Sequence, residues 1–195
     1  MEVSSLTLAE RQLIESAPSP WKTLTQKVAY ENPWIRVTHN TVVNPGGGEG
    51  IYGVVSFKNL AIGIVPVDNE GFTWLVGQYR YTCNAYFWEI PEGGGPLGEE
   101  PIETAKRELL EETGLVAKNW QLLCPIHTSN SVTDEAGYVF MAQDLEQFET
   151  SPEETEELVS WKLPLVEAIA MVMRGEITDS ISVAGLLLAG RKLGI

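Results

Sequence analysis

The chain has 195 residues, of which 44% are hydrophobic, and a formal net charge of −14 at pH 7. This length fits one domain of ordinary size, and the apolar content is sufficient for a packed core. The negative charge argues against a nucleic-acid partner, because basic proteins hold the nucleic-acid backbone by displacing its counterions. A substrate that carries phosphate would therefore have to bind together with a cation.

No segment approaches the roughly 20 uninterrupted apolar residues that a membrane-spanning helix requires. The first residues, MEVSSLTLAERQ, lack the basic region and the apolar core of a signal peptide. We therefore expect a cytoplasmic protein without a membrane partner. Cys83 and Cys124 are too few and too far apart in sequence for a disulfide framework or a four-ligand zinc site, and we expect buried free thiols.

The N-terminal part of the chain is predicted to contain a short helix and a group of strands. Residues 1–20 are expected to form an arm, with a helix from Leu6 to Ser16. Three strand-like runs follow: one ends near Tyr30, the second spans 34–43 and the third spans 52–57. Turn-forming residues lie between them. This pattern predicts an antiparallel meander.

The middle of the chain is predicted to contain a hairpin, a strand and a helix. Apolar runs at 60–67 and 73–79 flank the turn-forming sequence Asp68-Asn69-Glu70-Gly71, which favours a hairpin. A strand at 86–90 runs into glycines. The clearest helix starts at Pro101, where a missing N–H is tolerated, and stops at Gly114, a residue typical of helix C-termini.

The C-terminal part alternates strands and helices. Strands are expected at 120–126, 137–142 and 159–162, and helices at 164–174 and 180–192. The acidic segment from Glu146 to Glu157 is interpreted as a solvated loop. The order of elements predicts an α/β fold in which a mixed sheet lies between helical layers, and residues 21–195 are expected to form a single domain.

Three carboxylates are concentrated on the central predicted helix. Glu108, Glu111 and Glu112 are three and four residues apart, so their side chains leave the same face one turn apart. Their mutual repulsion destabilises the bare helix, and Mg²⁺, which prefers carboxylate and water oxygens, would neutralise it. Ordinary surface helices also carry clusters of Glu, so the spacing alone leaves a structural interpretation open.

The surroundings of these carboxylates resemble the Nudix box, which reads G, five residues, E, seven residues, R-E-apolar, any residue, E-E, any residue, G-apolar. Those positions are filled by Gly93, Glu99, Arg107-Glu108-Leu109, Glu111-Glu112 and Gly114-Leu115. The resemblance implies the Nudix α/β/α sandwich. Gly93, Gly95 and Gly98 also satisfy the G-x-G-x-x-G pattern of a dinucleotide-binding unit, but the carboxylates nearby would repel a pyrophosphate bound without metal.

The resemblance also implies how the box would hold a metal. It assigns Mg²⁺, with Mn²⁺ as a substitute, to Glu108 and Glu112, with Glu111 as a further candidate ligand. The residue before the box glycine often offers its backbone carbonyl to the metal, and here that residue is Glu92. Arg107 is expected to orient the helix carboxylates.

The segments Gly77-Gln78-Tyr79-Arg80-Tyr81 and Trp88-Glu89-Ile90-Pro91-Glu92-Gly93 resemble the family branch that hydrolyses ADP-ribose and nucleoside diphosphate sugars. By this resemblance Arg80 is a candidate phosphate ligand, since a guanidinium can bind two phosphate oxygens; a surface ion pair is the alternative. Trp34 or Trp21 is a candidate to stack on the nucleobase, with core packing as the alternative.

The same branch carries a carboxylate on a mobile loop after the box, and residues 128–135 resemble that loop. Glu135 is therefore the predicted general base, with Glu111 or Glu112 as the alternative. Carboxylates already bound to Mg²⁺ are poor proton acceptors because the metal lowers their pKa, which favours Glu135. The loop departs from the family pattern at Ser131, where glycine is common, and this leaves its geometry open.

Together these features predict a Mg²⁺-dependent hydrolase that cleaves the pyrophosphate of ADP-ribose or a nucleoside diphosphate sugar. The products would be a nucleoside monophosphate and a sugar phosphate. The alternatives are a Nudix-fold module that senses a nucleotide without turnover, and a diphosphate isomerase. The strand-rich residues 21–57, together with the resemblance, also predict a homodimer whose N-terminal strands build a shared site.

Overall fold

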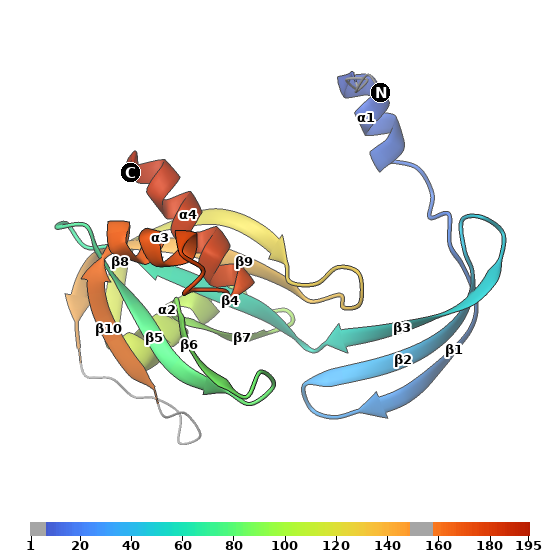
Figure 1. Ribbon diagram of the computed structural model, residues 1–195, viewed down its shortest axis with the longest axis horizontal. Coiled ribbons are helices and arrows are strands. Elements are labelled where there is room, and N and C mark those ends of the chain that lie inside the picture. The colour runs from blue at the N-terminus through green and yellow to red at the C-terminus, as the bar shows by residue number, and fades with distance from the viewer. Residues whose placement is uncertain (1–6, 149–157) are drawn as a thin grey trace.

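The computed structural model describes residues 7–148 and 158–195. Its N-terminal part contains helix α1 (Leu8–Glu15) and a three-stranded antiparallel sheet in the order β1 (Lys22–Glu31), β2 (Ile35–Val43) and β3 (Glu49–Phe57). The predicted meander is therefore confirmed. Figure 1 shows this sheet extending away from the larger body of the protein, with α1 standing clear of that body.

A four-stranded mixed sheet lies at the centre of the larger body. Its strands follow the order β7 (Glu92–Pro96), β4 (Asn59–Pro66), β9 (Ala136–Gln147) and β8 (Leu115–His127). Strands β4 and β9 are parallel, and the other neighbours are antiparallel. Side chains alternate along β4, so Ile62 and Ile64 join one apolar cluster while Val65 joins the other. The sheet therefore has an apolar core on each face.

Helices cover both faces of this sheet. They are α2 (Pro101–Thr113), α3 (Leu165–Met173) and α4 (Ser180–Leu193). Helix α2 packs on one face through Ala105 and Leu109, and α3 and α4 pack on the other through residues such as Met171 and Leu186. This arrangement confirms the predicted α/β/α sandwich (Figure 1). Helix α2 also ends as predicted, at Gly114, whose φ of 69° is the left-handed conformation that glycine adopts readily.

A second, antiparallel sheet lies beside the first. It contains β10 (Val159–Pro164), β5 (Phe72–Arg80) and β6 (Ala85–Glu89), in that order. The predicted hairpin between β4 and β5 is wrong, although its turn forms: Asp68 Oδ1 accepts hydrogen bonds from the backbone N–H groups of Glu70 and Phe72. Both edges of β4 are occupied by β7 and β9, so β5 pairs instead with β6 and β10.

The glycine-rich residues 92–96 form strand β7, which was not predicted, because pairing with β4 gives them a strand conformation that their own propensity does not favour. Most of the acidic segment 146–157 lies outside the described residues, and Glu146 and Gln147 belong to β9. Within the part of the chain that the structure describes, no helix has the length and apolar character needed to cross a membrane.

Candidate active site

Helix α2 brings two of the predicted metal ligands against strand β7. The carboxylate of Glu112 is buried and accepts a hydrogen bond from the backbone N–H of Glu92 at 3.0 Å. One turn earlier, the carboxylate of Glu108 lies directly over Gly93, where a Cβ would meet its carboxyl atoms at 2.1 to 2.4 Å. Only a residue without a side chain allows this approach. The helix and the strand together hold two carboxylates at the start of β7.

Arg107 links the same helix to the same strand. Its guanidinium lies 2.7 Å from Glu108 and 3.0 Å from Glu111, and it donates a hydrogen bond to the carbonyl of Gly94 at 3.2 Å. Burial lowers the pKa of Arg107, but the charges of Glu108 and Glu111 outweigh it, so the pKa is raised and the side chain stays charged. Arg107 therefore contacts two of the three helix carboxylates and β7.

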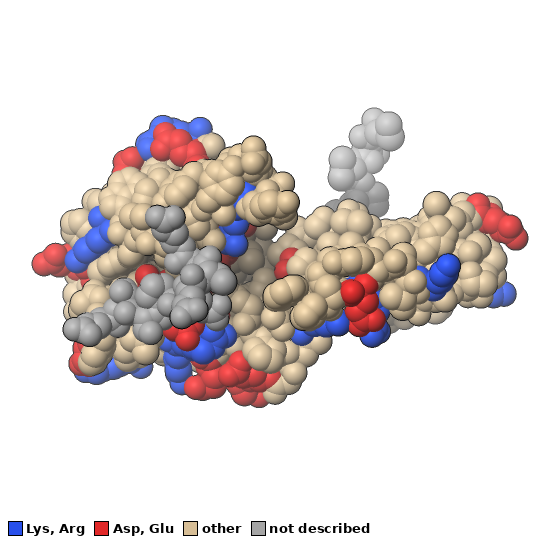
Figure 2. All heavy atoms as spheres, turned by 90° about the horizontal axis from the view of Figure 1, so that it is seen from below, with Lys and Arg blue, Asp and Glu red and all other residues tan. Residues whose placement is uncertain are grey.

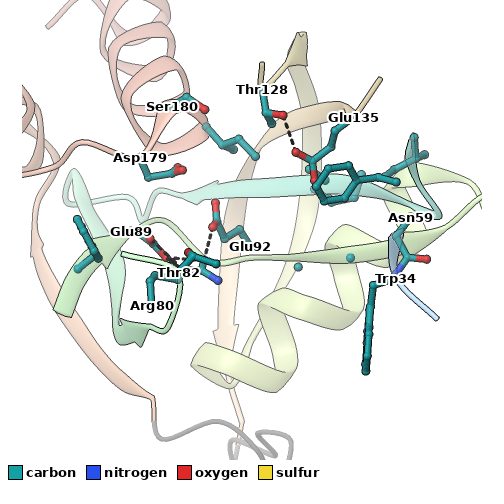
Figure 3. Close-up of a pocket in the computed structure, with 18 of the residues that line it drawn as sticks. Trp34, Asn59, Arg80, Thr82, Glu89, Glu92, Thr128, Glu135, Asp179 and Ser180 are labelled. Carbon is teal, nitrogen blue, oxygen red and sulfur yellow. Dashed lines mark hydrogen bonds and ion pairs between the residues drawn. The ribbon is translucent and has the colours of Figure 1, made fainter. Parts of the chain in front are cut away.

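A cavity of about 710 Å³ opens beside this end of β7. Four of the predicted site residues line it, namely Trp34, Arg80, Glu92 and Glu135 (Figure 3). Glu108, Glu111, Glu112 and Arg107 are not among its lining residues in the described chain. They adjoin it through Glu92 and Gly93, which do line it. The structure thus brings the sequence-predicted residues together as two neighbouring groups.

Arg80 binds two carboxylates inside the cavity. Its guanidinium lies 2.6 Å from Glu89 and 2.5 Å from Glu92, and Asp179 places a third carboxylate so close that oxygens of the three acids lie within 4.8 Å of one another. In Figure 3 the carboxylates of Asp179 and Glu92 point toward one another. Burial raises the pKa of Glu92 well above its usual range, and Asp179 and Glu89 raise it further, while Arg80 acts in the opposite direction.

Asp179 also belongs to the site, although no pattern in the sequence predicted it there. This residue caps helix α4, because its Oδ2 accepts a hydrogen bond from the backbone N–H of Ser182 at 2.7 Å. An Asp before an apolar helix is a recognisable capping signal. That signal gives no indication that the start of α4 lies beside Glu89 and Glu92, which are about 90 positions earlier in the chain. Their carboxylates were also not predicted to act together.

Glu135 lies at the end of the loop between β8 and β9. Its carboxylate accepts a hydrogen bond from the hydroxyl of Thr128 at 2.5 Å, and both residues line the cavity. Figure 3 shows the pair on the side of the cavity opposite to Arg80. Glu135 thus belongs to the lining of the cavity, to which the carboxylates of helix α2 do not belong.

Trp34 and Cys83 line the cavity and are exposed to solvent. Trp34, in the connection between β1 and β2, is 66% exposed and lines the cavity, so it does not belong to the core. Cys83 is exposed and also lines the cavity, and Cys124 is partly buried. The expectation of two buried thiols is therefore wrong for Cys83, because the turn between β5 and β6 carries it to the surface.

Comparison with known families divides the chain into two matched regions. The NUDIX domain matches residues 57–180, and the nucleoside diphosphate sugar hydrolase N-terminal domain matches residues 21–55. The boundary between the two matches falls at the end of β3, where the extended N-terminal sheet meets the larger body. Of the residues that line the cavity, Trp34 lies in the N-terminal matched region and Glu92 in the NUDIX region.

Individual proteins resemble the chain over most of its length. An ADP-ribose pyrophosphatase of Mycobacterium tuberculosis is 35% identical over 175 residues, which covers 88% of this chain and 84% of that protein. An ADP-ribose pyrophosphatase of Bacillus subtilis is 31% identical over 161 residues, covering 82% and 86%. A crystal structure of an ADP compounds hydrolase superposes with a TM-score of 0.81 at 21% identity and covers 92% of this chain and 97% of that one, so it supports the fold.

Proposed function

The chain belongs to the Nudix hydrolase family, and we propose that it hydrolyses the pyrophosphate of ADP-ribose or a related nucleoside diphosphate sugar with the help of Mg²⁺. The observation that carries the proposal is the convergence of Glu108 and Glu112 on the start of β7, next to a cavity that is also lined by Arg80 and Glu135. The products are a nucleoside monophosphate and the phosphate of the other half of the substrate.

The residues at the start of β7 fit a divalent cation by the chemistry of their donor atoms. Glu108 and Glu112 supply carboxylate oxygens, Glu111 lies one position from Glu112 on the same helix, and the backbone carbonyl of Glu92 is the fourth candidate donor. Hard cations such as Mg²⁺ and Mn²⁺ prefer this all-oxygen set. A bound Mg²⁺ neutralises charge on the phosphates and lowers the pKa of a water that it binds.

Glu135 is the group that we assign as general base. A general base must lie within hydrogen-bond reach of the attacking water and must keep a lone pair available. Glu135 lines the cavity and is not one of the helix carboxylates that would bind metal, so we expect its lone pairs to stay available for the proton. The hydroxyl of Thr128 holds its carboxylate in place until the water is positioned.

Arg80 and Trp34 are assigned to the two ends of the substrate. The guanidinium of Arg80 lines the cavity, and its planar fork can bind phosphate oxygens. It is already held by Glu89 and Glu92, which fixes its position before a substrate arrives. The exposed indole of Trp34 lies at the cavity wall and can stack on a nucleobase.

A panel of nucleoside diphosphate compounds tests this assignment. The protein is incubated with each compound and Mg²⁺, and phosphate is measured after phosphatase treatment. We expect release from ADP-ribose or a nucleoside diphosphate sugar, and loss of this activity in excess EDTA. Glu103→Gln is a matched control for Glu108→Gln and Glu112→Gln, because Glu103 is an exposed acid on the same helix, paired with Lys106. Tight binding of a compound without any turnover would instead support a nucleotide-sensing module.

The homodimer is proposed from the surface of the N-terminal sheet. All ten residues of β1 are exposed, and the sheet region carries exposed Trp21, Leu24, Val28, Tyr30 and Ile51. In Figure 2 the sheet projects from the body with mostly uncharged surface between scattered charged groups. Groups of exposed apolar side chains are typical of interaction sites, and a second copy of the chain is the partner that we propose for this group. Residues 21–57 would then be the dimerisation region of the single domain 21–195, preceded by the arm 1–20.

A further inference from the structure

The loop that carries Glu135 is joined to the edge of strand β3. The backbone N–H of Val55 donates to the carbonyl of Val132 at 2.9 Å, and the N–H of Asp134 donates to the carbonyl of Val55 at 3.2 Å. Val55 and Thr133 are partners in a parallel bridge. The segment just before Glu135 is therefore joined to the N-terminal sheet by a single β-bridge, although it follows β8 in the chain.

Among the loop residues that contact β3, Asp134 is the nearest in sequence to Glu135, and it contacts β3 through two different groups. Besides its N–H, its carboxylate Oδ1 accepts a hydrogen bond from the backbone N–H of Phe57 at 3.0 Å. Phe57 lines the cavity and is the last residue of β3. Asp134 thus forms hydrogen bonds with β3 at Val55 and at Phe57. Glu135 is the next residue after Asp134 in the chain. Such a two-point contact restricts both the position and the rotation of that backbone.

A third contact holds the outer part of the loop. The hydroxyl of Tyr52 donates to the carbonyl of Ser131 at 2.6 Å. Ser131 is the position at which the loop departs from the glycine common in the family branch, so this loop is secured at its unusual residue by a side chain of β3. Together the contacts at Tyr52, Val55 and Phe57 extend over residues 52–57, which are two thirds of β3.

We propose that Asp134 is a positioning residue for Glu135, and that strand β3 thereby sets where the general base stands in the cavity. The inference rests on the proposed function, in which Glu135 accepts a proton from the attacking water. Proton transfer requires hydrogen-bond distances, and a displacement of about 1 Å can lower the rate roughly 100-fold. The N-terminal sheet is therefore part of the catalytic apparatus of its own chain, in addition to any role in dimerisation.

Two substitutions at Asp134 separate positioning from charge. Asp134→Ala removes the acceptor for the Phe57 N–H, and we expect kcat to fall by roughly 10- to 100-fold with KM and Mg²⁺ affinity nearly unchanged. Asp134→Asn keeps an oxygen at that position and should retain most of kcat. Glu146→Ala is the control for loss of one negative charge, because Glu146 is exposed at the other end of β9. Equal losses in Asp134→Ala and Asp134→Asn would overturn the proposal.

The Glu135→Gln protein distinguishes this inference from the proposed function. If Asp134 acts through Glu135, then Asp134→Ala should cause no further loss of kcat in the Glu135→Gln background. Full additivity of the two losses would overturn the proposal. If Glu135→Gln alone keeps a normal kcat, the assignment of the base fails, and with it the proposal as stated.

Amide hydrogen exchange gives a readout that does not depend on activity. In Asp134→Ala the N–H of Phe57 should exchange faster, while amides in the centre of β4 keep their protection. Tyr52→Phe, which removes only a hydroxyl, provides a second variant if Asp134→Ala folds poorly: we expect faster exchange in residues 131–134 and a smaller fall in kcat. Unchanged exchange and unchanged kcat in Tyr52→Phe and in Asp134→Ala would overturn the proposal.

Discussion

Arg80 is surrounded by more negative charge than one guanidinium can neutralise. Glu89 and Glu92 bind it directly, and Asp179 lies beside them. The raised pKa of Glu92 is the response of a buried carboxylate to this crowding. An incoming pyrophosphate brings further negative charge into the same cavity. Arg80 alone cannot offset that charge. Our proposal therefore requires a cation at the start of β7.

The first prediction concerns Glu135. Glu135→Gln should lower kcat by roughly 100-fold while the affinity for metal and the KM for substrate stay close to those of the wild type, because an amide keeps the shape but cannot accept the proton. Steady-state kinetics and Mg²⁺ titration measure these quantities. Glu108→Gln and Glu112→Gln should weaken metal binding as well as turnover. A normal kcat in Glu135→Gln, together with inactive Glu111→Gln that still binds metal, would move the base to helix α2.

For single residues, the sequence predicted which side chains carry the chemistry better than it predicted which side chains contact one another in the fold. The box pattern singled out Glu108, Glu111 and Glu112 because their spacing on a helix is a local property. The contacts of Arg80 with Glu89 and Glu92 join strands β5, β6 and β7, and Asp179 comes from α4, so no local pattern could predict their meeting. Cys83 was assigned to the core from its residue type, whereas a turn places it at the surface.

Helix α2 and strand β7 illustrate what local signals do and do not predict for elements. Pro101 and Gly114 mark the ends of α2 through backbone preferences that act within the helix, and both ends were predicted. Strand β7 exists because β4 pairs with it, and the predicted β4–β5 hairpin fails because β4 pairs with β9 instead. Pairing between strands far apart in the chain depends on packing that a short sequence window does not contain.

The second prediction follows from the contact between these two elements. Gly93→Ala should weaken Mg²⁺ binding by about tenfold or more, because a Cβ at this position would overlap the carboxylate of Glu108 and push it away from Glu112. Isothermal titration calorimetry with Mg²⁺ measures the effect. Gly94→Ala is the matched control, since a Cβ there meets only the flexible amide of Asn59 at 3.1 Å. Equal Mg²⁺ affinity in the two variants would show that the close approach is not needed for metal binding.

The whole molecule combines a formal charge of −14 with a cavity that is built from both of its parts. Trp34 and Phe57 reach the cavity from the N-terminal sheet, and the remaining walls belong to the larger body (Figures 1 and 3). In our proposal, where Trp34 stacks on the nucleobase, substrate binding depends on how the sheet is held against the body.

The third prediction is that Mg²⁺ stabilises the folded protein. A ligand that binds only the native state at 100 times its Kd adds about 2.7 kcal/mol to the free energy of unfolding, which corresponds to a Tm increase of roughly 5 to 10 °C for a chain of this size. Calorimetry with and without Mg²⁺ tests this, and Ca²⁺ at the same concentration reports on selectivity. The increase should shrink in Glu108→Gln and persist in Glu103→Gln. An unchanged Tm at saturating Mg²⁺ would contradict a metal site formed by folding.

The fourth prediction concerns the dimer. Val28→Glu places a charge on exposed apolar surface of β1, and if that surface is covered by a second chain the buried charge should destabilise the dimer and shift the protein toward monomer. Gln26→Glu adds the same charge two positions away on the same strand, at a residue that is already polar, and should shift the equilibrium less. Light scattering over a range of concentrations gives the mass, and activity at each concentration shows whether the site depends on association. A monomeric wild-type protein with full activity would contradict the shared site, because each chain would then complete its cavity with Trp34 and Phe57 of its own N-terminal sheet.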